Sequence, residues 1–228
     1  GWIFRQSTAR EKLFWDNTIR CETKELKEGE IKSENIALPE DFDVPKSILF
    51  KTTHTIAEVW LDGEKIYEYG NEADAPGFMK TPGSCWHIVD IPGDSSGKNL
   101  EVRIIPVYEG YYGNEVSLVY GTRGDCILKI LTDCLGILVI SCGILFAAVI
   151  CILLYCGAAR RKRSDKTEAK IEIFLNLGFF SLLVAVWTLV QCGFLQFLIP
   201  DGRTLYFVEY FSLFLFPVPF NFLLYDIC

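Results

Sequence analysis

A long run without a charged side chain, Cys134–Cys156, constrains the fold of this chain more than any other feature. It contains 23 consecutive residues with no Lys, Arg, Asp or Glu. About 20 apolar residues in an α-helix cross the roughly 30 Å hydrocarbon layer of a bilayer. Two more apolar runs follow, the 27 residues 173–199 and the 21 residues 205–225. Three such runs so close together predict three transmembrane helices rather than the buried core helices of a soluble protein.

The third apolar run contains groups that a membrane helix usually avoids. Pro217 and Pro219 each remove a backbone hydrogen-bond donor, so we expect this helix to be bent or broken there. Glu209 lies near the start of the run, where we expect its carboxylate to reach water at the outer membrane interface. The prolines are a candidate hinge for signalling, although irregular packing is the commoner cause of such a kink.

The distribution of positive charge predicts the orientation of the helices. The 157–170 segment carries six basic residues: Arg160, Arg161, Lys162, Arg163, Lys166 and Lys170. The 200–204 segment carries one, Arg203. Because basic loops stay in the cytoplasm, we expect 157–170 to be cytoplasmic and 200–204 external. Residues 127–156, 171–199 and 205–228 then hold the three helices of a multi-pass plasma-membrane protein, and residues 1–126 form an extracytoplasmic domain.

The acidic charge of the chain belongs to its first half. Residues 1–126 hold 14 basic and 22 acidic side chains, whereas residues 127–228 hold 8 basic and 7 acidic. A nucleic-acid partner requires a basic face, so the sequence predicts no nucleic acid as partner. The first half is long enough to form one self-sufficient domain.

The stretch AEVWLDGEKIYEYG, residues 57–70, predicts a β-hairpin. Asp62-Gly63 suits a two-residue type I′ turn, in which both central residues have positive φ. That turn sets Val59 opposite Ile66 and places both in the core, together with Ala57 and Leu61. Trp60 and Tyr67 then point to the outer face.

Four more short segments share this composition, and no helical periodicity competes with them. They are residues 46–52, 86–92, 99–107 and 115–121, separated by clusters of Gly, Pro, Asp and Ser. Their spacing predicts an all-β, antiparallel sandwich ahead of the membrane helices. Within 86–92 we expect Trp86 to lie in the core and His87 on the polar surface. The acidic segments LKEGEIKSE and LPEDFD are expected to be solvated loops.

Cysteines and histidines predict no metal site and no cofactor. Six of the nine cysteines lie in or beside the apolar runs, where Cys acts as a small hydrophobe. Cys21, Cys85 and Cys126 remain. Three cysteines allow one bridge but specify none, so the sequence leaves a Cys21–Cys85 disulfide undecided. There is no C-x-x-C, and His54 and His87 stand alone. Phosphate-binding loops and hydrolase motifs are also missing, so we expect no catalytic residue in this sequence.

A ligand-binding role is the better hypothesis, and the segment VYEGYYGNE, residues 107–115, is its first candidate site. Aromatic rings stack on the apolar faces of sugars, while carboxylates and amides accept hydroxyl hydrogen bonds. Alternatively, these tyrosines pack over the end of the sandwich or against the first helix, and Trp60 is covered by a neighbouring segment. The candidate ligand-binding residues are Tyr108, Glu109, Tyr111, Tyr112, Asn114 and Trp60.

Several segments in sequence order resemble one known family. They are ILFKTTHTIAEVWLDGEKIYEYG, PGSCWHIVDIP and EVRIIPVYEGYYGNEVSLVYGT, the last directly before a membrane helix. Together with FLNLGFFSLLVAVWTLVQCGFLQFL and LYFVEYFSLFLFPVPFNFLLY, they resemble bacterial seven-transmembrane receptors with diverse intracellular signalling modules. The resemblance implies a galactose-binding-like jelly roll outside, seven helices and a cytoplasmic output domain, often a GGDEF diguanylate cyclase. Four of those helices and any output motif are not found in this sequence, so we expect it to be either a fragment or an incomplete gene model.

The leading hypothesis is therefore a signal-transduction receptor that senses a small, carbohydrate-like molecule. A first alternative is the sensory part of a membrane-bound diguanylate cyclase, and a second is a transporter or membrane-assembly component with a sugar-binding lobe. The expected partners are the lipid bilayer, the ligand and the protein's own cytoplasmic output domain, and a homodimer remains open. We expect the link at residues 121–133 to be too short to let the outer domain wander freely.

Overall fold

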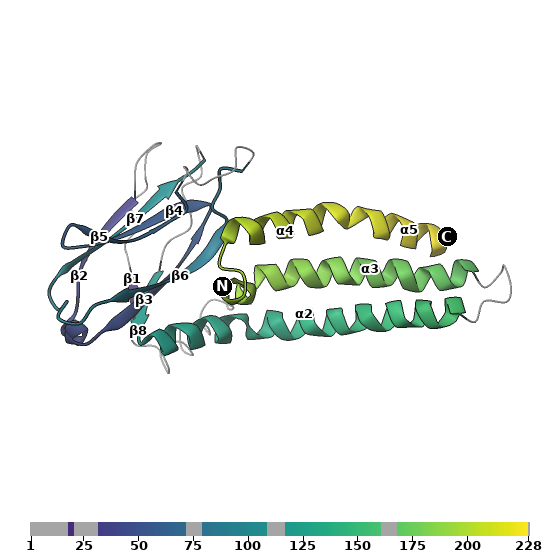
Figure 1. Cartoon of the computed structure of the whole chain (residues 1–228), viewed down its shortest axis with the longest axis horizontal. Coiled ribbons are helices and arrows are strands. Elements are labelled where there is room, and N and C mark those ends of the chain that lie inside the picture. Colours follow the sequence, from purple (N-terminus) through teal and green to yellow (C-terminus); the bar gives the residue numbers. More distant parts are fainter. Residues whose placement is uncertain (1–17, 21–31, 72–78, 109–116, 161–167, 228) are drawn as a thin grey trace, which may run out of the picture. The chain divides into compact units, whose positions relative to one another are not determined.

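The computed structural model describes residues 18–20, 32–71, 79–108, 117–160 and 168–227. The chain forms two compact units, Gly1–Lys129 and Ile130–Cys228. The first unit is built of strands and the second of helices, in the order expected (Figure 1).

The first unit contains two four-stranded antiparallel sheets. One sheet has the strand order β1-β8-β3-β6 and the other β2-β7-β4-β5. The strand bounds are β1 Thr18–Arg20, β2 Lys32–Ala37, β3 Lys46–Thr53, β4 Thr55–Leu61, β5 Glu64–Tyr69, β6 Ser84–Ile91, β7 Asn99–Pro106 and β8 Ser117–Gly121. The prediction of an antiparallel β domain is confirmed. β2 and the short 3₁₀ helix Glu40–Asp43 lie where we expected only solvated loops.

Alternation of side chains along the strands builds one core between the two sheets. In β4 every second residue is buried, and Ala57 and Val59 are fully enclosed. Phe50 from β3 and Leu100 from β7 are enclosed as well, so both sheets supply the same cluster. Each large apolar side chain removed from water in this way contributes about 1.5–3 kcal/mol. Phe42 of the 3₁₀ helix closes the core with no exposed surface.

The hairpin of β4 and β5 has the predicted turn but not the predicted register. Asp62 has φ 49° and Gly63 has φ 85°, as a type I′ turn requires. Trp60 lies opposite Lys65 as expected, but a bulge between Val59 and Trp60 then sets Val59 opposite Tyr67. The extra residue reverses the direction of the side chains that follow it. The expectation that Tyr67 points outward is therefore wrong, because its ring packs against the core.

Three helical stretches are long and apolar enough to cross a membrane, which confirms the three predicted spans at that level. They are α2, Arg123–Arg160, then α3, Glu168–Gln191, and finally α4, Gly202–Leu215, followed by α5, Pro217–Ile227. At 1.5 Å per residue the 38 residues of α2 extend about 57 Å, longer than the hydrocarbon layer. A short 3₁₀ helix, η4, Phe194–Phe197, follows α3 and ends the second apolar run.

The third span breaks at its prolines as predicted. α4 ends at Leu215 and α5 begins at Pro217, with Phe216 between them. Phe216 lies over Trp187 and Phe180 of α3, with ring centroids 6.0 and 6.1 Å away. At its other end α4 is capped by Asp201, whose carboxylate accepts hydrogen bonds from the backbone N–H groups of Arg203 and Thr204.

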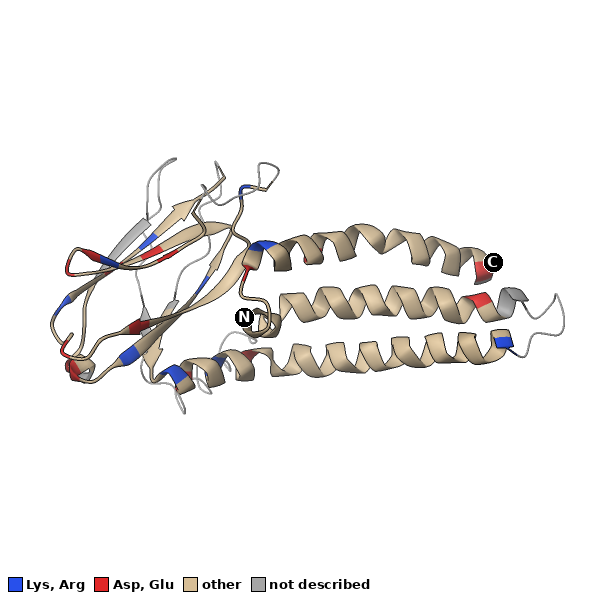
Figure 2. Cartoon of the chain, viewed as in Figure 1, with Lys and Arg blue, Asp and Glu red and all other residues tan. Residues whose placement is uncertain are grey.

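The helical unit exposes many apolar side chains and pairs several of its polar ones between helices. Phe214 is 75% exposed and Phe146 68%. Figure 2 shows charged residues on the strands and near the ends of α2 and α3, while the middles of these two helices carry none. Inside the unit, Ser141 of α2 donates a hydrogen bond to Thr188 of α3 over 2.8 Å. This arrangement suits a hydrocarbon solvent, in which exposed apolar side chains carry no penalty.

Candidate functional site

The predicted ligand-binding residues are only partly described. Tyr108 follows β7 in a bend and is 42% exposed. Glu109, Tyr111, Tyr112 and Asn114 lie outside the described residues. The tyrosine-rich segment therefore remains a prediction, and Trp60 is the candidate whose surroundings can be analysed in full.

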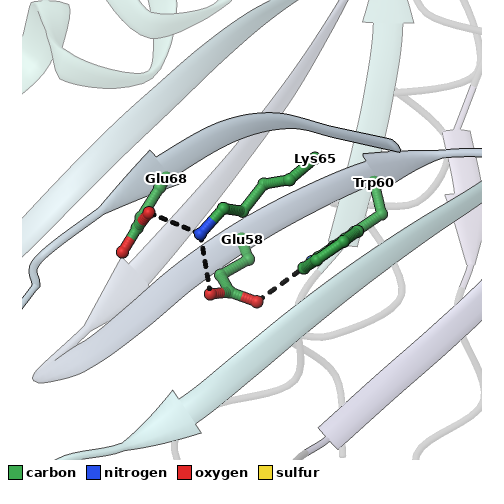
Figure 3. A network of polar contacts seen from close by, with 4 residues as sticks. All are labelled: Glu58, Trp60, Lys65 and Glu68. Carbon is green, nitrogen blue, oxygen red and sulfur yellow. Dashed lines mark hydrogen bonds and ion pairs between the residues drawn. The ribbon is translucent and has the colours of Figure 1, made fainter. Parts of the chain in front are cut away.

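Trp60 lies on the outer face of β4, between the inward-facing Val59 and Leu61. Its indole Nε1 donates a hydrogen bond to Glu58 Oε2 over 3.0 Å. The ammonium of Lys65 lies 2.6 Å from Glu68 Oε2 and 3.6 Å from Glu58 Oε1 (Figure 3). The hydrogen bond to Glu68 and the charges of both carboxylates raise the pKa of Lys65. Glu58 thus joins the tryptophan to the lysine.

Two cations from the neighbouring strands lie over the Trp60 ring. Arg103 on β7 has its Cζ 4.5 Å from the ring centroid, and Lys65 Nζ on β5 is 5.7 Å away. Arg103 is itself held by Glu101 through contacts of 2.7 and 3.0 Å. We call Glu58, Trp60, Lys65, Glu68, Glu101 and Arg103 the Trp60 network. Because cation–π contacts already occupy the ring, a sugar that stacks on Trp60 must displace at least one cation.

A second polar group lies inside the sandwich, centred on His87. Its Nε2 is 2.7 Å from Thr52 Oγ1 and its Nδ1 is 3.0 Å from the hydroxyl of Tyr67. The rings of Phe50 and Tyr69 lie about 5 Å away, at 4.9 and 5.0 Å between centroids. Burial lowers the pKa of His87 to about 3, and burial together with the charge of Cys85 raises that of Tyr67 to about 12. The cluster is thus uncharged at neutral pH.

These positions reverse the expectation for β6. His87 is 1% exposed and Trp86 is half-buried on the other face, with the ammonium of Lys51 5.5 Å from its ring centroid. Cys85, His87 and Val89 share the inward face, because alternation starts from Cys85. The sulfur of Cys85 lies 3.0 Å from the hydroxyl of Tyr69. Cys85 has no disulfide within the described part of the chain, and Cys21, the partner that the sequence left open, lies outside it.

A third group ties the start of α2 to the sheet β1-β8-β3-β6. β8 ends at Gly121 and α2 begins at Arg123, so a single residue, Thr122, connects them. Arg123 donates to Asp90 Oδ2 over 2.6 Å, and Ser47 donates to Asp90 Oδ1 over 2.6 Å. We call Ser47, Asp90, Thr122, Arg123, Asp125 and Cys126 the strand-to-helix junction.

Buried contacts make this junction firm. Cys126 is 1% exposed, and its thiol points to the backbone carbonyl of Ser47 at 3.7 Å. Asp125 accepts hydrogen bonds from the N–H and hydroxyl of Thr122, and Thr122 Oγ1 accepts one from the N–H of Asp125. This reciprocal cap fixes the first turn of the helix. The ion pair of Arg123 with Asp90 is 61% exposed on both sides and adds at most about 1 kcal/mol.

Sequence reasoning did not identify the junction, since residues 121–133 were expected to form a link. The local pattern T-x-x-D before an apolar run is a helix-start signature and points to the cap. The partners Ser47 and Asp90 are distant in sequence and carry no such signal.

No constellation for metal binding emerges from the parts of the chain that the structure describes. Those residues contain no group of three or more His, Cys, Asp or Glu able to hold a metal ion. Comparisons of the chain with protein-family models, with curated proteins and with solved structures found no match. The arrangement of these groups is therefore the basis for a functional hypothesis.

Proposed function

We propose that this protein is a membrane receptor in which the β domain senses a small extracytoplasmic molecule and α2 carries the signal toward a cytoplasmic output module. The observation that carries the proposal is the strand-to-helix junction. One residue separates β8 from the helix that is long enough to span the bilayer, and the first turn of that helix is packed on the sheet through Cys126. Displacement of β8 by a ligand therefore acts directly on α2.

The strand order supports a jelly-roll domain of the galactose-binding type. β1 pairs with β8, β2 with β7, β3 with β6 and β4 with β5, as in one long antiparallel ribbon. Pairing of β8 with β3 and of β7 with β4 then wraps the ribbon into two sheets. Eight strands in two such sheets are typical of jelly rolls.

The charge pattern supports the proposed orientation. The six basic residues of the 157–170 segment favour a cytoplasmic position for that segment, between α2 and α3. The β domain then lies outside the cytoplasm, where nutrients and signals arrive. Tyr108, two residues after β7, is the described and exposed member of the candidate ligand site.

The test of this proposal uses the full chain in lipid nanodiscs. Titration with a panel of monosaccharides and small metabolites, followed by calorimetry, identifies a ligand. Hydrogen exchange is then measured at the end of α2 near Arg160, with and without that ligand. We expect the ligand to change exchange there, because only a conformation-dependent contact can shift a two-state equilibrium.

The matched variants are R123A at the junction and R160A at the far, exposed end of the same helix. R123A should keep the ligand affinity within about twofold but reduce the exchange response, since the salt bridge to Asp90 is lost. R160A should leave both unchanged. Absence of heat with every compound contradicts the sensing role, whereas an undiminished response in R123A contradicts transmission through the ion pair of Arg123 with Asp90.

A further inference from the structure

The two sheets of the β domain adjoin at one pair of edge strands. β5 is the last strand of the sheet β2-β7-β4-β5, and β6 is the last strand of the sheet β1-β8-β3-β6. Among the described strands β5 forms backbone pairs with β4 alone, and none of its six residues is buried. A strand with few buried side chains and one neighbour opens at a lower free-energy cost than the strands of the core. We therefore expect β5 to leave the sandwich without unfolding of the whole domain.

Two tyrosines of β5 hold this strand against β6. The hydroxyl of Tyr67 lies 3.0 Å from Nδ1 of His87. The hydroxyl of Tyr69 lies 3.0 Å from Sγ of Cys85 and donates a hydrogen bond to the backbone carbonyl of Pro82 over 3.2 Å. The two tyrosines share the inward face of β5, because the bulge in β4 shifts the pairing of the hairpin. We call these three contacts the tyrosine bridge.

His87 is the member of the tyrosine bridge that acid converts to a cation. Its second nitrogen, Nε2, lies 2.7 Å from Oγ1 of Thr52. A neutral imidazole donates through one nitrogen and accepts through the other, so one of the two neighbouring hydroxyls donates to the ring. Protonation turns both nitrogens into donors and removes that acceptor. The hydrogen bonds of the closed sandwich are therefore complete only while His87 is neutral.

The elements packed around His87 provide no negative charge within the described residues. β3 contributes a phenyl ring and a hydroxyl, and β4 and β7 contribute apolar core residues. The charged side chains of β5, Lys65 and Glu68, pair with each other on the exposed surface. The ionisable groups that face the ring are two phenols and one thiol, those of Tyr67, Tyr69 and Cys85. Burial without a carboxylate partner lowers the pKa of His87 to about 3.

We propose that β5 is an acid-sensitive flap, in which protonation of His87 breaks the tyrosine bridge and favours a state with β5 detached from β6 and the imidazolium in water. Opening also carries Lys65 away from Trp60 and so removes one of the two cations that lie over that ring. Acid thereby loosens the Trp60 network on the side of β5. This switch requires no ligand and is independent of the proposed sensing role and of transmission through α2.

The two states of the imidazole set the size of the effect. The pKa of His87 is about 3 in the closed sandwich, and the ordinary value of 6.5 applies once the ring reaches water. The open state therefore binds the proton first as the pH falls. The opening equilibrium constant of β5 should rise about 25-fold between pH 7 and pH 5.

The experiment measures hydrogen exchange of the full chain in nanodiscs at pH 7 and pH 5, without any ligand. After correction for the intrinsic pH dependence of exchange, the protection of the β5 amides should fall about 25-fold. This fall should persist unchanged in low concentrations of urea, because a local opening exposes little surface. The amides of β7, a central strand of the same sheet, should be better protected and should respond to urea. Equal protection and equal urea dependence in β5 and β7 would overturn the proposal.

Exchange in histidine variants assigns the pH response to one residue. H87Q should abolish the difference in β5 protection between pH 7 and pH 5. H54N removes the other imidazole and is the matched control, since Asn tolerates the φ of 56° found at this turn. H54N should retain the 25-fold change. A response that survives in H87Q, or one that is lost in H54N, would overturn the role of His87.

A tyrosine variant tests the bridge itself and does not depend on the folding of H87Q. Y67F keeps the aromatic ring but removes the hydroxyl that contacts His87, so β5 protection at pH 7 should fall about fivefold. Y120F makes the same change on β8 and should leave β5 protection unchanged. Equal β5 protection in Y67F and Y120F would show that the tyrosine bridge does not hold β5, and the proposal would fail.

Discussion

The two units of this protein place their apolar side chains in opposite directions. In the β domain Phe42 and Phe50 have no exposed surface, whereas in the helical part Phe146 and Phe214 are mostly exposed. The polar side chains also lie in opposite places in the two units. Glu58 and Lys65 lie on the outer face of the sheet, whereas Ser141 donates a hydrogen bond to Thr188 between two helices. The difference shows that each half is built for its own solvent, water for one and hydrocarbon for the other.

The largest expected effect compares two phenylalanines. F50A removes an enclosed ring and should lower the free energy of unfolding of the β domain by about 3–5 kcal/mol. F146A removes a ring that faces outward from α2 and should change the stability of the helical part by less than about 1 kcal/mol. Denaturant unfolding in nanodiscs, followed separately by strand and helix amide exchange, measures both. Equal losses would contradict the assignment of Phe146 to a lipid-facing surface.

Introducing a charged side chain tests directly whether an exposed face is in contact with water or with lipid. Val149 on α2 is 44% exposed and Val44 of the β domain 57% exposed. V149R should lower membrane integration by about 2.5–3.5 kcal/mol, because a guanidinium near the bilayer centre is poorly solvated. V44R should change stability by less than about 0.5 kcal/mol. Integration into microsomes and thermal unfolding are the measurements, and normal integration of V149R would place this face of α2 in water.

Acid should weaken the β domain through His87. Its folded pKa of about 3 lies below the ordinary value of 6.5, so the unfolded chain binds the proton first as pH falls. Stability is therefore complete above pH 6.5 and declines below it, by about 2 kcal/mol between pH 7 and pH 5. The helical unit contains no histidine and should not share this slope.

H87Q is the control for this pH dependence. Unfolding measured across pH 5–7 should be flatter in H87Q than in the unaltered protein, although H87Q is less stable at neutral pH. The remaining slope should come from His54, whose pKa is also lowered by burial. An unchanged slope in H87Q would show that another group controls acid sensitivity.

The smallest expected effect concerns polar pairing between helices. T188V removes the acceptor for Ser141 and should cost about 0.6 kcal/mol, the average for such bonds in membranes. S212A removes a hydroxyl that donates to the Val208 carbonyl of its own helix and has no other partner among the described residues, so it should be nearly neutral. Thermal unfolding in nanodiscs compares the two variants. A larger loss in S212A would mean that the interhelical bond contributes little to the packing of α2 on α3.

Patterns in the sequence predict those parts of the fold that depend on neighbours along the chain. The apolar runs of the helices and the Asp62-Gly63 turn carry their own signals, and both are found. The bulge beside Val59 has no such signal in the sequence. It is a shift in how β4 pairs with β5, and the residue types of the strand do not reveal it. β2 was also missed, since an edge strand as polar as KSENIA shows no alternation.

The candidate sites depend on contacts that sequence separation hides. Trp60 was identified from its residue type, but Arg103 reaches its ring only because β7 pairs with β4. The reversal of Trp86 and His87 has a similar origin. Because Trp86 and His87 are consecutive in β6, either ring can face the core. The hydroxyls of Thr52 and Tyr67 lie within hydrogen-bond distance of the His87 ring nitrogens, which favours burial of His87 rather than Trp86.

The single residue between β8 and α2 has a geometric consequence. An α-helix advances about 100° and 1.5 Å with every residue. One residue added beside Thr122 would therefore rotate the side chains at the start of α2, Arg123–Lys129, by more than a quarter turn about the helix axis, and two would nearly reverse their facing. The length of this connection sets which side of the first turns of α2 meets the sheet that precedes it.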